Sequence, residues 1–359
     1  MRQQLGLTAI LLGLLVVATG CPSSTPTTPA AVTKPAFTLA WSEYPSWSVF
    51  GVADESKLID GEEGKFGPIE EKWGVDIVLK EAPYDSCLNM YAGNNCDAVC
   101  ITNMDALNPA MGRKTTVILP TSTSVGADAC LVVGINSLEE LRNHKVYGLE
   151  NTVSQYCFVR NLELQGEKEA DHKFTNLDPA IAASNMQGKL PDYQAIMVWN
   201  PFVLQTLKDR HDAKVLFDSS TIPGEIIDMV AMSNDSLAKP GGKDFACAVI
   251  ETFYEVNKML ADKDKGDETL VALGEKFSRL ELEDMKKVVQ QTKFYKTPDE
   301  ALQLINSKEL PATMKTVVDF CVSHTIVPQA PKVAYGKAAE DDDAHLRFDP
   351  TYLETYKSK

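Results

Sequence analysis

The sequence predicts an α/β protein of two lobes, each an open, mostly parallel sheet flanked by helices. Three observations support this fold class. Strands alternate with helices along the chain, which is the pattern of a parallel sheet connected by helices. The alternation restarts after residue 137 with a second set of strands and helices. An apolar strand at residues 226–232 then returns towards the first lobe, so two strands cross between the lobes as a hinge.

The first lobe is predicted from apolar runs, which form strands, and from capped stretches, which form helices. We expect its strands at residues 37–40, 75–79, 98–101 and 117–119. We expect its helices at residues 51–60, 69–73, 84–92 and around Leu107. Residues 98–101 are continuously apolar, which is typical of a strand buried on both faces. Polar residues 121–124 are expected to form a loop after the fourth strand.

The second lobe repeats this pattern, and the rest of the chain is strongly helical. We expect its strands at residues 130–133, 145–148, 174–176, 195–199 and 214–217. We expect its helices at residues 138–141, 153–164, 179–187 and 201–207. Further helices are predicted at residues 244–260, 269–275, 282–291, 298–305 and 312–323. The predicted lobes therefore comprise residues 37–128 with 226–359, and residues 129–225.

The amino terminus predicts export. Arg2 precedes an apolar run at residues 5–17 and small residues directly before Cys21, which is typical of a secretory signal peptide at residues 1–20. The small residues followed by Cys21 resemble a bacterial lipobox, so we expect Cys21 to be lipidated; the alternative is an ordinary cleaved signal with a chance cysteine. Residues 21–36, rich in Pro, Ser and Thr, would form the tether. The protein is expected in the periplasm or at the cell surface, anchored to the membrane.

Composition narrows the function classes. The net charge of -15 over 359 residues argues against nucleic acid, whose binding requires a basic surface. No stretch beyond the amino terminus is apolar over the roughly 18 residues of a membrane span. Seven cysteines follow Cys21, an odd number, so at least one is a free thiol. Cys87 and Cys96 are the nearest plausible disulfide pair, although the sequence leaves the connectivity open.

An aromatic loop follows the first predicted strand. Trp41, Tyr44 and Trp47 lie within seven residues, and Pro45 forces a turn there. Loops at the carboxyl ends of strands are where α/β folds place ligands. Any single ring is expected to pack in the core, but three rings on one loop favour a wall of a ligand site. Trp41, nearest the strand end, is the ring we expect to contact the ligand first.

Several segments together resemble one family. They are residues 41–47, Tyr91-Ala92-Gly93, Cys96-Asp97-Ala98-Val99, Thr102-Asn103-Met104-Asp105-Ala106-Leu107, Val153-Ser154-Gln155-Tyr156 and Val198-Trp199-Asn200-Pro201. Over about residues 37–353 the chain resembles the solute-binding proteins of bacterial ABC importers, in the nitrate/sulfonate/taurine branch with the type II periplasmic-binding-protein fold. It is similar in particular to binding proteins encoded beside urea-carboxylase-type enzymes. The resemblance implies a monomer that carries a solute in an interlobe cleft to an inner-membrane permease, without a cofactor or metal.

The candidate ligand-binding residues lie on loops and helix ends that this fold turns towards the cleft. They are Trp41, Tyr44, Trp47, Thr102, Asn103, Asp105, Ser122, Ser124, Ser154, Tyr156, Trp199, Asn200, Glu225 and Asp228. Helix capping is the alternative for the hydroxyl and amide side chains, and a hinge role is the alternative for Glu225 and Asp228. Asp128 also lies on a cleft-side loop, whereas Arg113 is the only arginine we expect near one. Aromatic rings and acids without cations favour an amine, amide or guanidinium-like solute.

Other functions have less support in the sequence. None of the five histidines stands in a metal-binding pair, and neither a nucleophile elbow nor a phosphate-binding Gly-rich loop is present. We therefore expect no catalytic activity. An enzyme related to thiamine-pyrimidine synthases shares the expected fold and is one alternative; a sensor that signals to a membrane partner is another. Within transport, a sulfonate or nitrate ligand is the alternative solute.

Overall fold

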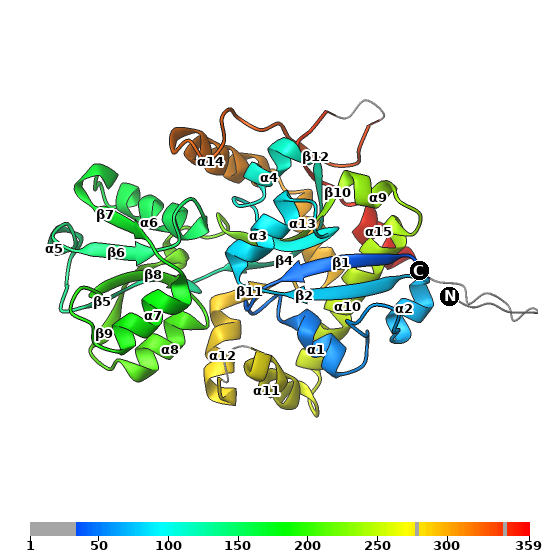
Figure 1. Ribbon diagram of the computed structural model, residues 1–359, viewed down its shortest axis with the longest axis horizontal. Helices are drawn as coiled ribbons and strands as arrows, with labels where there is room; N and C mark the ends of the chain where they lie inside the picture. Colours follow the sequence, from blue (N-terminus) through cyan, green and yellow to red (C-terminus); the bar gives the residue numbers. More distant parts are fainter. Residues whose placement is uncertain (1–33, 277–279, 340–342) are drawn as a thin grey trace, which may run out of the picture. The chain divides into compact units, whose positions relative to one another are not determined.

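Two β-sheets form the framework of the part of the chain that the computed structural model describes, residues 34–276, 280–339 and 343–359 (Figure 1). Residues 34–359 belong to one compact unit. The predicted signal peptide, the lipidated Cys21 and most of the predicted tether lie outside the described residues. Among the helices of the described ranges, none combines the length and apolar character that crossing a membrane requires.

The first sheet has the strand order β12-β13-β4-β10-β3-β1-β2, with β11 paired to β4. Its strands are β1 (Ala36–Trp41), β2 (Asp76–Glu81), β3 (Ala98–Thr102), β4 (Thr115–Ser124), β10 (Ile227–Ser233), β11 (Thr292–Phe294), β12 (Val333–Tyr335) and β13 (Leu346–Phe348). β1 runs parallel to β2 and β3, whereas β10 runs antiparallel to both of its neighbours, β3 and β4.

The second sheet has the order β7-β6-β8-β5-β9. Its strands are β5 (Asp128–Val133), β6 (Lys145–Gly148), β7 (Lys173–Asn176), β8 (Ala195–Trp199) and β9 (Ala213–Asp218). β6 is parallel to β7 and β8, and β5 is antiparallel to β8 and β9. Both sheets therefore repeat one arrangement, in which the antiparallel strand is the one that has just crossed from the other sheet.

The helices pack around the two sheets (Figure 1). They are α1 (Val49–Glu55), α2 (Pro68–Trp73), α3 (Tyr84–Ala92), α4 (Leu107–Gly112), α5 (Leu138–Leu141), α6 (Val153–Leu164), α7 (Pro179–Gln187), α8 (Phe202–Asp209), α9 (Asn234–Ala238), α10 (Gly242–Ala261), α11 (Gly266–Lys276), α12 (Leu282–Gln291), α13 (Pro298–Ile305), α14 (Leu310–Ser323) and α15 (Thr351–Ser358), with short 3₁₀ turns at Glu169–Asp171 and Ser219–Thr221. The predicted α/β fold class with two crossing strands is confirmed; the predicted lobe boundaries stay a prediction.

Three details differ from the predicted elements. The helix expected at residues 51–60 ends at Glu55, because Lys57 adopts a left-handed φ of 56° and turns the chain. Residues 121–124 are not a loop but the end of β4, where they pair with β10 and β11. The short strands β11, β12 and β13 and the helix α15 were not expected, because they contain too few residues to show a period.

Asp97 joins the start of β3 to β1 and α9. Its carboxylate accepts hydrogen bonds from Thr38 N (2.9 Å), Thr38 Oγ1 (3.0 Å), Ser236 Oγ (2.6 Å) and Lys239 Nζ (2.8 Å). Burial alone would raise the pKa of Asp97, but the hydrogen bonds from Lys239, Ser236 and Thr38 lower it. We therefore expect Asp97 to be a structural residue.

Replacing Asp97 with Asn should lower the free energy of unfolding at pH 7 by about 1–3 kcal/mol, because charged hydrogen bonds are lost. A carboxylate with a lowered folded-state pKa contributes stability above its unfolded pKa of about 4, and that contribution disappears as the pH falls through the folded pKa. Urea denaturation should thus show the two proteins converging below about pH 4. The exposed Glu268→Gln variant is the control, and an equal loss in both variants would contradict this role of Asp97.

Candidate binding site

A small pocket lies where the two sheets face each other at the ends of their strands. Its unfilled space, including its opening to solvent, is about 260 Å³. The pocket is lined by Tyr44, Trp47, Tyr84, Thr102, Asp128, Val153, Trp199, Ile226 and Asp228. A site of this size suits a ligand of only a few non-hydrogen atoms, since drug-sized ligands occupy roughly 300–1,000 Å³.

Strand register explains why these residues meet. Thr102 and Trp199 are the last residues of the parallel strands β3 and β8. A strand that arrives from the other sheet starts at this same edge and runs away from it, so the first residues of β5 and β10 also lie there. Accordingly Asp228 pairs with Thr102 on one side and Ser122 on the other, and Asp128 pairs with Trp199.

Aromatic rings form a continuous row through the pocket. The ring centroids of Tyr44 and Trp47 are 4.8 Å apart, those of Trp47 and Tyr84 5.4 Å, and those of Tyr84 and Trp199 5.8 Å. The row starts on the loop after β1 and reaches the end of β8, so it links the two sheets. Such rings supply apolar walls, and their faces attract a cation by about 0.5–2 kcal/mol each.

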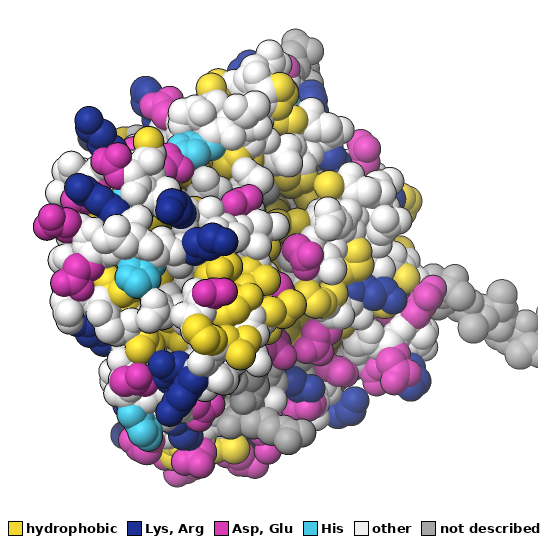
Figure 2. Space-filling view, turned by 60° about the vertical axis from the view of Figure 1, so that its left-hand side comes forward, with side chains coloured by type: hydrophobic (Ala, Val, Ile, Leu, Met, Phe, Trp, Pro, Cys, Tyr) yellow, Lys and Arg dark blue, Asp and Glu magenta, His cyan; other side chains and the backbone are white. Residues whose placement is uncertain are grey.

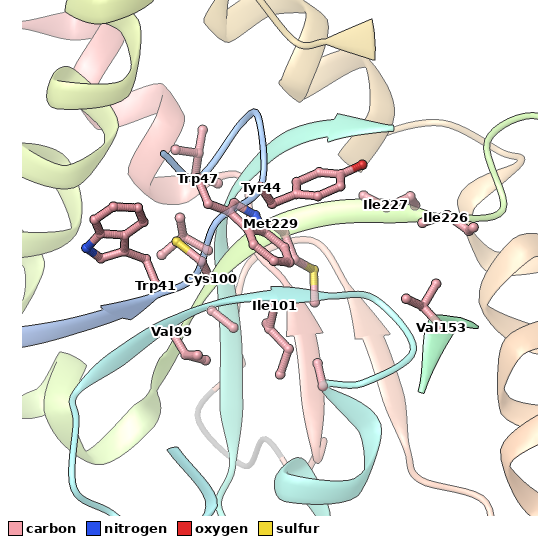
Figure 3. Close-up of a cluster of buried hydrophobic side chains, with 14 of the residues drawn as sticks. Trp41, Tyr44, Trp47, Val99, Cys100, Ile101, Val153, Ile226, Ile227 and Met229 are labelled. Carbon is pink, nitrogen blue, oxygen red and sulfur yellow. The ribbon is translucent and has the colours of Figure 1, made fainter. Parts of the chain in front are cut away.

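Trp41 does not belong to this row, although the sequence favoured it as the first ligand contact. It continues the alternation of Phe37 and Leu39 along β1, so its side chain lies on their face of the sheet. Its ring lies against Gly51 of α1, and Figure 3 shows it pointing away from the other two rings of the loop. Trp41 is a core residue; the expectation was wrong because it counted distance along the chain and ignored the pleat of the strand.

Two carboxyl groups in the pocket are buried without a cation. Asp128 and Asp228 are 3% and 1% exposed. Asp228 Oδ2 accepts a hydrogen bond from Ser122 Oγ at 2.5 Å. Burial raises the pKa of Asp228 well above its usual range, and the charge of Asp128 raises it further. Burial likewise raises the pKa of Asp128 to about 6, and no lysine or arginine contributes to either shift.

Asp105 supports the pocket from behind Tyr84. Its Oδ2 accepts hydrogen bonds from Tyr84 Oη at 2.7 Å and from Thr102 Oγ1 at 2.9 Å. Burial raises the pKa of Asp105 to about 6. This side chain therefore holds the Tyr84 ring in place and adds a third buried acid close to the pocket.

Several polar atoms of the pocket have no partner. Within the described residues, Trp47 Nε1, Tyr44 Oη and Asp128 Oδ2 are buried and make no hydrogen bond. An unsatisfied buried polar group costs about 1–3 kcal/mol, and native structures satisfy most of them with protein or water. A ligand that offers both N–H donors and an acceptor would satisfy all three atoms.

The remaining predicted residues fall into two groups. Ser122 and Ser124 support the acids, because Ser122 donates to Asp228 and Ser124 Oγ accepts from Asp128 N at 3.3 Å. The others are buried or bonded outside the pocket lining. They are Asn103, bonded to Glu225 O and Ile227 N; Ser154, in the first turn of α6; Tyr156, bonded to Glu225; and Asn200, bonded to Gln291.

Glu225 is engaged by an arginine that sequence reasoning missed. Arg160 of α6 donates from Nε to Glu225 Oε2 at 2.9 Å and from Nη2 to Oε1 at 3.0 Å. Burial alone would raise the pKa of Glu225, but the bonds from Arg160 and Tyr156 lower it. Arg113, by contrast, donates to Ser233 Oγ at the far end of β10 from the pocket, so the expectation that it lies near the cleft is wrong.

Tyr84, Val153 and Ile226 line the pocket but were not among the sequence candidates, and Asp128 was only noted as a cleft-side acid. Tyr84 could have been found, because it follows the end of β2 as Tyr44 follows the end of β1. Val153 and Ile226 carry no polar group that would single them out in a sequence.

The cysteines and other metal-binding side chains stay outside this site. The seven cysteines of the described ranges are all buried free thiols, so Cys87 and Cys96 are not joined. Burial raises the pKa of both thiols to about 12. Among the described residues, no three or more His, Cys, Asp or Glu side chains are arranged to hold a metal ion.

Comparisons with known proteins show similarity at the level of structure. No protein-family model matches the chain, and no curated protein sequence is detectably similar to it. The periplasmic aliphatic sulphonate binding protein SsuA from Escherichia coli is similar with a TM-score of 0.64 and 18% identity, over 82% of this chain and 94% of that one.

Two further solved structures are similar. The alkanesulfonate-binding protein SsuA from Xanthomonas axonopodis pv. citri, bound to MOPS, has a TM-score of 0.66 and 14% identity over 84% of this chain and 96% of that one. A ligand-binding component of an ABC-type import system from Staphylococcus aureus has a TM-score of 0.63 and 10% identity over 89% and 98%. These similarities establish the fold, which is that of the periplasmic binding proteins.

Replacing Asp128 with Asn should stabilise the ligand-free protein above about pH 6. A carboxyl whose pKa is raised on folding contributes stability that is complete below the unfolded pKa of about 4 and is lost as the pH rises through the folded pKa. Thermal unfolding should show the wild type losing about 1–3 kcal/mol relative to the variant between about pH 4 and pH 7. An exposed control, Asp235→Asn, should show no such trend, and a pH-independent difference for Asp128→Asn would refute the raised pKa.

Proposed function

We propose that the protein is the extracytoplasmic solute-binding component of an ABC importer. It would capture a small nitrogen-containing solute (an amine, an amide or a guanidinium-like cation) in the pocket between the sheets and deliver it to an inner-membrane permease. The fold supports this role, because the three similar structures are described as binding proteins or a ligand-binding component of import systems. The predicted signal peptide and lipidated Cys21 support an exported, membrane-anchored protein.

One observation carries the choice of solute: two buried carboxyl groups face a pocket walled by aromatic rings and lined by no lysine or arginine. A cation in the pocket would pair with a carboxylate and lie against the rings. At about 4 Å and an effective dielectric constant of about 20, one such pair is attractive by about 4 kcal/mol before desolvation. N–H groups of the solute would also satisfy the unpartnered Asp128 Oδ2.

A sulfonate or nitrate is the alternative solute, because two of the similar structures are named as sulfonate-binding proteins. The same arithmetic opposes it here, since an anion beside Asp128 and Asp228 would be repelled by about as much as a cation is attracted. The lining contains no cation to compensate. The narrower resemblance to binding proteins encoded beside urea-carboxylase-type enzymes agrees with an amide or guanidinium-like ligand.

Contacts between the sheets support capture by closure around a hinge. Besides the Tyr84–Trp199 ring pair, Asn200 Nδ2 donates to Gln291 Oε1 at 2.8 Å, and Lys208 Nζ pairs with Asp284 Oδ2 at 3.0 Å. These few polar contacts lie at the rim, where opening would expose them to water at little cost. We propose that the solute stabilises this closed arrangement and that the permease binds it.

An enzymatic role has no support from the pocket. Its lining contains no histidine or cysteine, whereas the alternative related to thiamine-pyrimidine synthases uses both. A sensor role would use the same pocket and differ only in the membrane partner.

A thermal-shift screen tests the proposed solute class. Binding to the folded state raises the melting temperature, so amines, guanidinium and small amides should raise it, whereas taurine and nitrate should not. Pyrimidine precursors test the enzyme alternative in the same screen. A rise only with taurine or nitrate would refute the proposal.

A matched pair of variants then tests the site. Trp47→Phe removes an unpartnered N–H and part of the pocket wall, so it should weaken binding of the best solute by about tenfold, or ~1.4 kcal/mol. Trp41→Phe makes the same change in a core residue of the same loop and should leave the affinity unchanged. Calorimetry at equal protein stability measures both, and equal effects of the two variants would remove Trp47 from the site.

A further inference from the structure

A wider groove adjoins the pocket and shares two of its residues. Tyr84 and Trp199 line both spaces. The groove has about 1130 Å³ of unfilled space, including its opening to solvent, and is therefore much larger than the pocket. It runs from the ends of β1 and β2 on one sheet to the starts of α7 and α8 on the other. A ligand held in the pocket can therefore extend past the ring pair into this groove.

Three acids line the groove, and no lysine or arginine does. Glu43 and Glu81 come from the first sheet, and Asp178 comes from the start of α7. Burial raises the pKa of Glu81, and the charges of Glu43 and Glu55 raise it further, although Lys276 opposes them. The groove therefore holds negative charge at a place where that charge is partly shielded from water.

The walls between these acids are apolar. Ala82, Pro83 and Phe202 line the groove together with the two shared rings. On the face drawn in Figure 2, hydrophobic side chains gather near the centre, with acidic side chains among and beside them. A surface that alternates apolar walls with carboxylates suits methylene groups that end in a cation, because the methylenes gain about 25 cal/mol per Å² of buried area.

A buried hydroxyl also lacks a partner in this groove. Ser42 lines it and is 4% exposed, yet its Oγ makes no hydrogen bond within the described residues. Satisfied hydroxyls are the rule for buried serines. Ser42 is thus an observation, independent of the acids, that points to a missing polar partner here.

We propose that the groove is a second cation subsite and that the ligand is a linear aliphatic diamine or longer polyamine. One ammonium group would occupy the pocket beside Asp128 and Asp228, the chain would pass along the Tyr84–Trp199 pair, and the far ammonium group would lie by Glu81 and Asp178. This inference rests on the proposed function and names the substrate class of the same site.

Calorimetry with linear α,ω-diamines of increasing length, each compared with the n-alkylamine of equal carbon count, tests the second subsite. The diamine of fitting length should bind at least about fivefold more tightly than its monoamine, because a partly buried ion pair is added. Glu81→Gln and Asp178→Asn should each reduce that preference without changing the affinity for the monoamine. Asn can replace Asp178 as the cap of α7, so this variant should fold. Glu268→Gln removes an exposed charge elsewhere and is the control.

The outcomes separate this inference from the proposed function. Equal affinity for diamines and monoamines, together with silent Glu81→Gln and Asp178→Asn variants, would overturn the second subsite and leave the amine pocket intact. If neither amine binds, the proposed function fails and the second subsite fails with it. A diamine preference that Glu268→Gln reduces as much as Glu81→Gln does would reflect overall charge and would also overturn the second subsite.

Discussion

The antiparallel pairing of β4 with β10 is the constraint on which the site depends. β4 takes the chain towards the second sheet, and β10 brings it back along the same line. Because each crossing strand starts at the edge where the parallel strands end, Asp228 lies between Thr102 and Ser122, and Asp128 lies beside Trp199. Polar residues at the end of β4 are thus strand residues that face the site, and the binding chemistry follows from connectivity.

Burying acids in this position has an energetic consequence. Asp105, Asp128 and Asp228 all have raised pKa values because they are buried, so the ligand-free protein is less stable near neutral pH than it would be without them. Functional sites commonly carry such destabilising groups, which a ligand then stabilises. A cation that enters between the rings and the carboxylates offsets this cost, and the same gain in free energy would favour the closed arrangement of the sheets.

Much of the fold was predictable because its signals are local. The continuous apolar run of β3, the capping residue Thr152 before α6 and Gly74 after α2 each define an element within a few residues. The site was only partly predictable. Trp41 was misplaced although its period-two relation to Leu39 was visible, whereas the pairing of Arg160 with Glu225 joins residues 65 positions apart and has no local signal.

Proton exchange on binding tests the central claim, that buried carboxyl groups without a counter-ion form a cation site. Calorimetric titration with the best amine or guanidinium ligand near pH 6, in buffers of different ionisation enthalpy, measures the protons released. Because a bound cation favours the ionised carboxylates and lowers their pKa, the account predicts release of about one proton. Uptake of protons, or no exchange, would contradict it and would indicate an anionic or neutral ligand instead.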